Sequence, residues 1–197
     1  MANDDAYFMA LGRFVHAFSE VEKAIHYSFA NFTKLKIPIA HIIKRESGAK
    51  DLISIIKQTV RLNKFSDKAI AEVECLFTHF DAISIFRNRV LHRGAYLQED
   101  GTYLSHNMAT MRTMEAYEMA TFTLEDIQFA TRDLGRMAIR IYDVANVTPY
   151  HQMTKRDPRA APLLLAPWQY KSVELVTPNK ARPSKSPVPS RPPPASR

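Results

Sequence analysis

The sequence predicts an all-α fold: an up-and-down bundle of four to five helices with a small β-hairpin insertion and a disordered C-terminal tail. Apolar residues recur at three- and four-residue spacing through most of residues 1–147. A short segment around Asp100-Gly101 interrupts that period and is typical of a hairpin turn. Eleven of the 12 prolines follow residue 147. We therefore expect a helical domain over 1–147, a partly ordered extension over 148–177 and a disordered basic Pro-rich tail over 178–197.

The first half of the predicted domain contains three helical segments. Residues 5–33 predict one long amphipathic helix, whose apolar positions are Leu11, Phe14, Val15, Phe18, Val21, Ile25, Phe29 and Phe32. Pro38 suits the first turn of a short second helix. Ser47-Gly48 marks a break, after which another helix is expected to end near Leu62-Asn63.

The second half begins with a third long helix at about 67–92, with Ser66 as its N-cap and Gly94 as its left-handed terminating residue. The hairpin is expected between Tyr96 and Asn107. Thr123, followed three residues later by Asp126, resembles a capping box. It predicts a fourth long helix that runs to about residue 147.

The positive charge of the chain is confined to its C-terminal part. The formal net charge is +7, yet residues 1–147 carry 18 Lys+Arg and 18 Asp+Glu, whereas residues 148–197 carry 9 and 2. The predicted domain is therefore neutral, and the basic composition gives no argument that the folded part binds nucleic acid. The tail either raises RNA affinity through phosphate contacts or acts as a solubilising linker.

Several classes of protein are excluded by composition and motifs. One cysteine, Cys75, excludes a disulfide framework and a single-chain thiolate zinc site, and we expect it in the core. No run approaches the roughly 18 apolar residues of a membrane span, and the acidic start is unlike a targeting peptide, so a cytoplasmic protein is expected. Phosphate loops, dinucleotide turns and hydrolase elbows are missing, and the histidines lack metal-site spacing, so we expect no cofactor and no metal.

Two charged residues occupy unusual places on the predicted helices. Arg87 falls near the middle of the apolar arc of helix 67–92, and Glu22 sits between Phe18 and Ile25 on the first helix. An unpaired buried Arg is very costly, so we expect Glu22 to contact Arg87. A buried salt bridge without a chemical role would explain the same pattern.

A polar stripe runs beside that arc through Glu74, Thr78, Asp81, Asn88 and His92. Asn88 and His92 are four residues apart and therefore lie together. Arg87 and His92 lie about 140° apart on an ideal helix, a separation that a long Arg side chain and a loosened helix end could bridge.

The segment Arg87-Asn88-Arg89-Val90-Leu91-His92, near the end of a helix in an α bundle, resembles the HEPN superfamily, whose ribonuclease members carry an Arg-x(4–6)-His motif. The long first helix with Phe18-Ser19-Glu20-Val21-Glu22 is also similar to members of this group. The resemblance covers roughly residues 5–147. An Arg-Asn-x-x-x-His pattern is expected by chance about 0.02 times in a chain of this composition.

The resemblance implies a metal-independent endoribonuclease in which the 2′-hydroxyl of the RNA attacks the adjacent phosphorus. His92 would be the general base or acid, Arg87 would neutralise the phosphorane and Asn88 would orient His92 or the phosphate. Glu22 would fix Arg87, and Asp81 is a weaker orienting candidate. Arg89 and Arg93 either hold RNA phosphates or simply favour a helix C-terminus.

The resemblance also implies a homodimer, or a pseudo-dimer with a related chain, with the 67–92 helices near the axis. The implied role is a toxin or defence factor, with an antitoxin or a nucleotidyltransferase-type protein as its partner. One alternative is a non-catalytic HEPN-like module that binds RNA, nucleotide or a partner. Another is a helical interaction protein that acts through its tail, including the apolar segment around Trp168, which either packs back on the bundle or docks a partner.

Overall fold

A computed structural model of the chain describes residues 2–108, 112, 117–145, 166–173 and 175–176. Within these residues the chain forms five helices and four short strands, so the fold is mainly helical with a small antiparallel sheet. The tail over 178–197 and the apolar run Leu163-Leu164-Leu165 lie outside the described residues. No described helix combines the length and the apolar character needed to span a bilayer.

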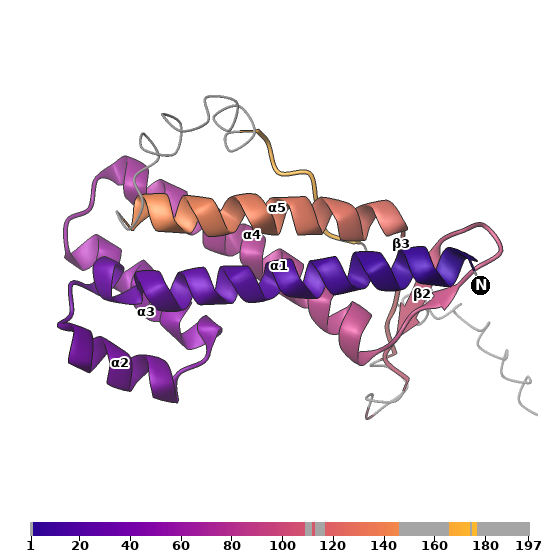
Figure 1. Cartoon of the computed structure of the whole chain (residues 1–197), viewed down its shortest axis with the longest axis horizontal. Helices are drawn as coiled ribbons and strands as arrows, with labels where there is room; N and C mark the ends of the chain where they lie inside the picture. Colours follow the sequence, from indigo (N-terminus) through magenta and orange to yellow (C-terminus); the bar gives the residue numbers. More distant parts are fainter. Residues whose placement is uncertain (1, 109–111, 113–116, 146–165, 174, 177–197) are drawn as a thin grey trace, which may run out of the picture.

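The helices are α1 (Ala2–Thr33), α2 (Ile37–Glu46), α3 (Ala49–Leu62), α4 (Asp67–His92) and α5 (Leu124–Val144). Figure 1 shows α1 and α5 side by side along the long axis, with α4 passing behind them and α2 at the end opposite the sheet. Phe14 of α1 packs edge-to-face on Phe86 of α4. One turn further along, Phe18 stacks on Phe80. The predicted period is confirmed for most positions, because one apolar stripe of each long helix forms the shared core. Val15, which was expected in the stripe of α1, is instead 37% exposed.

The helix ends follow the predicted signals. The Ser66 hydroxyl accepts a hydrogen bond from the Ala69 N–H at 3.3 Å, and Thr123 and Asp126 form a reciprocal capping box. Gly94 has a φ of +71°, which a side chain would strain, and it turns the chain directly after α4. These helix ends could be predicted from the sequence because each cap is formed by residues within a few positions of one another.

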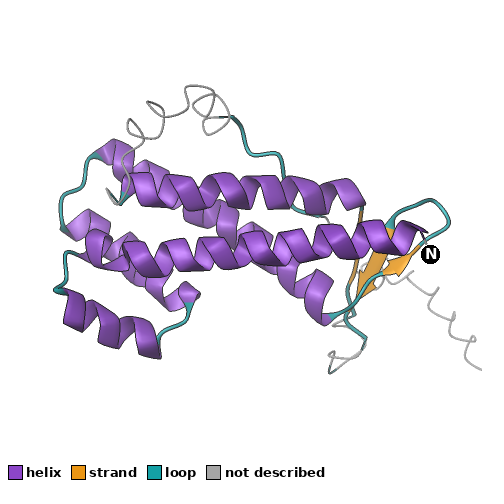
Figure 2. Ribbon diagram, viewed as in Figure 1, coloured by secondary structure: helices purple, strands orange, loops and turns teal. Residues whose placement is uncertain are grey.

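The sheet is larger than the predicted hairpin. Its strands are β1 (Tyr96–Leu97), β2 (Tyr103–His106), β3 (Met119–Phe122) and β4 (Leu175–Val176), in that order and all antiparallel. Figure 2 shows the strands gathered at one end of the helices, near the N-terminus. The prediction of an all-α fold with only a hairpin is corrected here. The two added strands are too short to show an alternating pattern, and β4 pairs with a strand more than fifty residues earlier.

Residues 166–173 pack back on α4 and α5. Trp168 stacks on His79 of α4, with ring centroids 4.7 Å apart, and the guanidinium groups of Arg136 and Arg140 lie over the same indole at 5.3 and 4.7 Å. The indole N–H donates to the sulfur of Cys75 at 3.5 Å. Of the two interpretations of this apolar segment, packing on the bundle is therefore the one that the described residues show.

Candidate functional site

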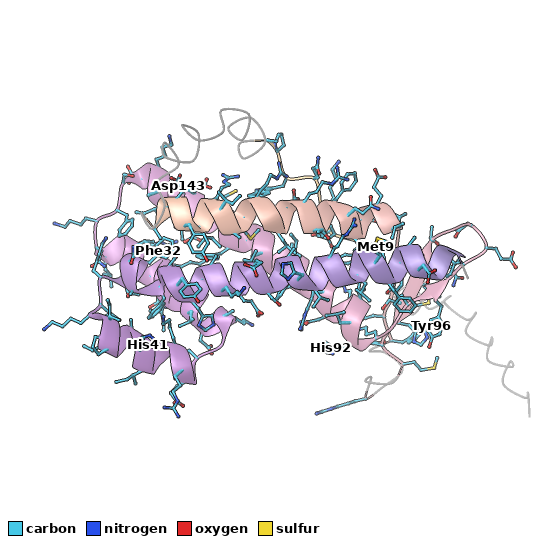
Figure 3. The ribbon with its side chains drawn as sticks, in the orientation of Figure 1. Met9, Phe32, His41, His92, Tyr96 and Asp143 are labelled. Atoms are coloured by element: carbon cyan, nitrogen blue, oxygen red, sulfur yellow. The ribbon has the colours of Figure 1, made fainter. Side chains whose placement is uncertain are left out.

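Arg87, Asn88 and His92 meet at the C-terminal end of α4. Nη1 of Arg87 donates to Oδ1 of Asn88 at 3.0 Å and lies 3.3 Å from Nε2 of His92. The helix continues to His92, so the contact needs no loosened helix end. The long Arg side chain alone crosses the gap between the two faces. Figure 3 places His92 at the same end of the molecule as Tyr96 and the sheet.

The direction of these hydrogen bonds defines the state of the imidazole. A guanidinium has five N–H donors and no acceptor. Nε2 of His92 must therefore accept from Arg87 with its lone pair, which places the ring proton on Nδ1. The cluster thus presents a neutral imidazole nitrogen beside a permanent positive charge. If Arg87 turns its N–H toward a bound anion, the lone pair of Nε2 becomes free to accept a proton beside that anion.

Arg87 is half-buried and its guanidinium lies over the ring of Phe18, 5.4 Å from the centroid. The expected pairing with Glu22 is not formed: neither residue takes part in an ion pair among the described residues. The reason is the rotation of α4. Phe86, which is 1% exposed, occupies the buried centre, so Arg87 lies at the border of the apolar face and reaches solvent without a carboxylate.

Two weaker candidates, Glu22 and Asp81, stay outside the cluster. Glu22 is half-buried, and Asp81 is exposed on the outer face of α4. Neither makes a hydrogen bond or an ion pair with Arg87, Asn88 or His92 in the described part of the chain. The structure therefore gives no contact through which either would orient the cluster directly.

Arg89 and Arg93 are engaged inside the protein. Nη1 of Arg89 donates to the carbonyl of Val173 at 3.3 Å, and Nη1 of Arg93 lies 3.0 Å from Oε2 of Glu118. Burial, and after it the charge of Arg93, lowers the pKa of Arg89. Both guanidinium groups connect the C-terminal end of α4 to neighbouring segments, Arg89 to Val173 and Arg93 to Glu118, and so stabilise the fold.

The cluster is an open surface. A groove of about 440 Å³ lies elsewhere, between α1 and α5, and is lined among others by Met9, Arg13 and Arg132. None of the three cluster residues lines it. Among the described residues, no three His, Cys, Asp or Glu side chains come together in a way that would hold a metal ion.

A second polar cluster, around Asp133, was not predicted. Asp133 is fully buried and bonds to His79, Arg136 and the backbone of residues 169 and 170. Its signal in the sequence is of the same kind as that of Arg87: an acid at 133 between apolar positions 130, 134 and 137. Cys75, expected in the core, is instead exposed, and its sulfur accepts the indole N–H of Trp168 beside this cluster.

Comparison with protein-family models, with curated proteins and with solved structures finds no match to this chain.

Proposed function

We propose that this protein is a metal-independent endoribonuclease of HEPN type that cleaves RNA by attack of a 2′-hydroxyl on the adjacent phosphorus. One observation carries the proposal. The Arg87 guanidinium touches both Asn88 and a neutral His92 nitrogen at an exposed helix end. The same residue types at the same spacing carry the resemblance to ribonucleases of the HEPN superfamily.

The roles follow from the donor and acceptor inventory. When the Arg87 N–H moves from Nε2 of His92 to a phosphate oxygen, the freed Nε2 lone pair takes the proton of the 2′-hydroxyl, and the deprotonated oxygen forms a bond to phosphorus. Arg87 neutralises the extra negative charge of the phosphorane, and Asn88 holds Arg87 in place through its Oδ1. The bond from phosphorus to the 5′-oxygen then breaks, and that oxygen takes a proton from the protonated His92 of a second copy of the chain. The products are a 2′,3′-cyclic phosphate and a 5′-hydroxyl.

A homodimer completes this scheme. Each cluster supplies one imidazole, while the reaction needs a proton acceptor and a proton donor. The side chains of Asn88 and His92 are also exposed to water on a single chain. Two copies with α4 near a twofold axis would bring two His92 side chains to one cleft. Size measurement at micromolar concentration tests this, and a strict monomer argues against the composite site.

The biological role in the proposal comes from the resemblance. It is a toxin or defence factor acting on cellular or invading RNA in the cytoplasm, neutralised by an antitoxin or paired with a nucleotidyltransferase-type partner. Co-expression with a candidate partner should restore growth if the protein is toxic by RNA cleavage.

The test of the activity is incubation of the purified protein with labelled single-stranded RNA and tRNA in excess EDTA. Wild-type protein should give cyclic-phosphate ends, and His92→Ala and Arg87→Ala should each lower the rate by about 100-fold or more. His41→Ala and Arg45→Ala are matched controls, because both side chains are exposed on α2, at the opposite end of the molecule (Figure 3). They should cleave like wild type.

Cleavage that survives in His92→Ala and Arg87→Ala would place the activity elsewhere or in a contaminant. No cleavage by folded wild-type protein would contradict the enzyme proposal and favour the non-catalytic binding module.

A further inference from the structure

The two faces of the sheet carry aromatic residues of different exposure. On the face toward the helices, Tyr103 stacks on Tyr7 and Phe122 and is 5% exposed. The opposite face carries Tyr96, whose register partner is Leu104, and His106, whose partner is Met119. Tyr96 is 57% exposed. The inner rings are explained by packing, and the outer ones are not.

The outer aromatic residues form a continuous row. The rings of Tyr96 and His106 are stacked, with centroids 5.5 Å apart and planes 11° apart. The ring of Tyr117 follows His106 at 6.3 Å with a 40° tilt. We call Tyr96, His106 and Tyr117 the aromatic row. Its end ring, Tyr96, has one face on His106 and remains largely open to solvent, so a further flat ring can be added to the stack.

The aromatic row begins close to the Arg87–His92 cluster. Tyr96 follows His92 by four residues, so their Cα atoms lie within about 14 Å even for an extended chain. The left-handed turn at Gly94 shortens that path. Figure 3 shows Tyr96 and His92 at the same end of the molecule. A strand of RNA whose phosphate lies at Arg87 therefore passes the row within a few nucleotides.

The charge around this surface favours an anionic occupant. Within the described part of the chain Arg87 makes no ion pair, and Arg112, in the loop between β2 and β3, is exposed. Glu118, next to Tyr117 in the chain, is paired with Arg93, whereas Glu99 and Asp100 lie exposed on the turn between β1 and β2. An exposed tyrosine ring a few residues from the Arg87 guanidinium matches a nucleic acid whose bases are unpaired, because a base in a duplex has no free face to stack.

We propose that the aromatic row is a binding site for an unpaired nucleobase and that it selects single-stranded RNA for the Arg87–His92 cluster. The inference rests on the proposed ribonuclease function for its biological meaning. In this proposal the ring of Tyr96 stacks on a base that flanks the phosphate bound at Arg87. Tyr96 is a binding residue in this scheme and takes no part in proton transfer.

The test uses a 12-nucleotide 2′-O-methyl RNA with a fluorescent label, which lacks the attacking hydroxyl and so measures binding without cleavage. Fluorescence anisotropy should show tighter binding of the single strand than of the same sequence in a duplex. Tyr96→Ala should weaken single-strand binding by about 5- to 100-fold, and Tyr96→Phe, which keeps the ring, by less than about twofold.

Two further variants keep the result interpretable. Tyr96→Leu keeps an apolar side chain on β1 without a flat ring and should bind as weakly as Tyr96→Ala. Tyr27→Ala removes a tyrosine that is 67% exposed, against 57% for Tyr96, from the C-terminal half of α1, away from the sheet, and should bind like wild type. A melting temperature within about 3 °C of wild type shows that a variant is folded.

The outcomes separate the two proposals. Equal binding by Tyr96→Ala and wild type, or equal binding of duplex and single strand, overturns the aromatic row. Selective single-strand binding that depends on Tyr96 supports the row even if unmodified RNA is not cleaved, in which case the ribonuclease proposal alone fails. If cleavage does occur, Tyr96→Ala should raise KM by a similar factor and leave kcat within about twofold.

Discussion

Oδ2 of Asp133, on α5, lies 3.0 Å from Nε2 of His79 on α4 and accepts the backbone N–H groups of Gln169 and Tyr170 at 2.8 Å each. Arg136 donates to the other carboxylate oxygen. One buried carboxylate therefore connects two helices and the C-terminal extension. Burial by itself raises the pKa of Asp133, but the hydrogen bonds from His79, Tyr170 and Arg136 outweigh it and hold that pKa below the ordinary value.

Replacement of Asp133 by Asn should destabilise the fold. The groups around Asp133 donate hydrogen bonds to both of its carboxylate oxygens. An asparagine would replace one of these oxygens by an NH₂ group, which donates, so at least one buried donor would lose its acceptor. We expect Asp133→Asn to lower the free energy of unfolding by about 2–4 kcal/mol, measured by urea denaturation. Asp81→Asn, on an exposed carboxylate of α4, is the control and should stay within about 0.5 kcal/mol of wild type. Equal effects of the two would contradict the role of Asp133.

Tyr170 should make the stability fall at high pH. Burial raises its pKa to about 12, although a hydrogen bond with the Val173 backbone and the charge of Arg89 act in the opposite direction. Because the unfolded pKa is about 10, the contribution is fully present below about pH 10 and is lost as the pH rises through about 12. Between these values the free energy of unfolding of Tyr170→Phe should fall less steeply than that of wild type, by up to about 2 kcal/mol. If the free energies of unfolding of wild type and Tyr170→Phe fall in parallel over this pH range, the prediction is wrong.

Two truncations should behave differently. Deletion of residues 178–197 removes no contact among the described residues and should leave the melting temperature within about 2 °C. Deletion of residues 148–197 also removes β4, Trp168 and the two backbone donors of Asp133, and should lower the melting temperature by about 10 °C.

The shorter truncation is therefore the better test of a protein that acts through its tail, because the longer one also damages the fold. Loss of function on removal of 178–197, with His92→Ala fully active, would favour that alternative over the ribonuclease.

Arg87→Lys tests the forked geometry of the cluster. A lysine keeps the charge and can remain over Phe18, but its single ammonium cannot reproduce the planar guanidinium contacts to Asn88 and His92. If the proposed activity holds, kcat should fall about 10- to 100-fold in the EDTA-resistant cleavage assay. The melting temperature should change by less than about 2 °C, since Arg87 lies at the border of the core. Arg45→Lys is the matched control and should retain full activity.

Most of the helical fold could be predicted from the sequence because its signals are local. The apolar period, the Ser66 cap, the Thr123–Asp126 capping box and Gly94 each involve neighbours along the chain, and all have the expected structure. That Arg87, Asn88 and His92 lie near one another could be predicted for the same reason, since the three are within six residues of one another in the chain.

The Glu22–Arg87 pairing was wrong because helix geometry alone does not define how α4 is rotated against α1. That rotation depends on which large side chain fills the core, and Phe86 fills it between Phe14, Phe122 and Tyr170. Once Phe86 is buried, Arg87 reaches solvent and needs no buried acid.

The sequence by itself determined the helices, their ends and the residues of the candidate cluster. The tertiary structure decided the rest: the pairing of β3 with β4, the Asp133 connection to His79 and the exposure of the aromatic row. These features depend on contacts between segments far apart in the chain, such as Asp133 with residues 169 and 170. A buried carboxylate is stable only where hydrogen-bond donors surround it. When those donors come from distant segments, a local sequence pattern cannot identify them.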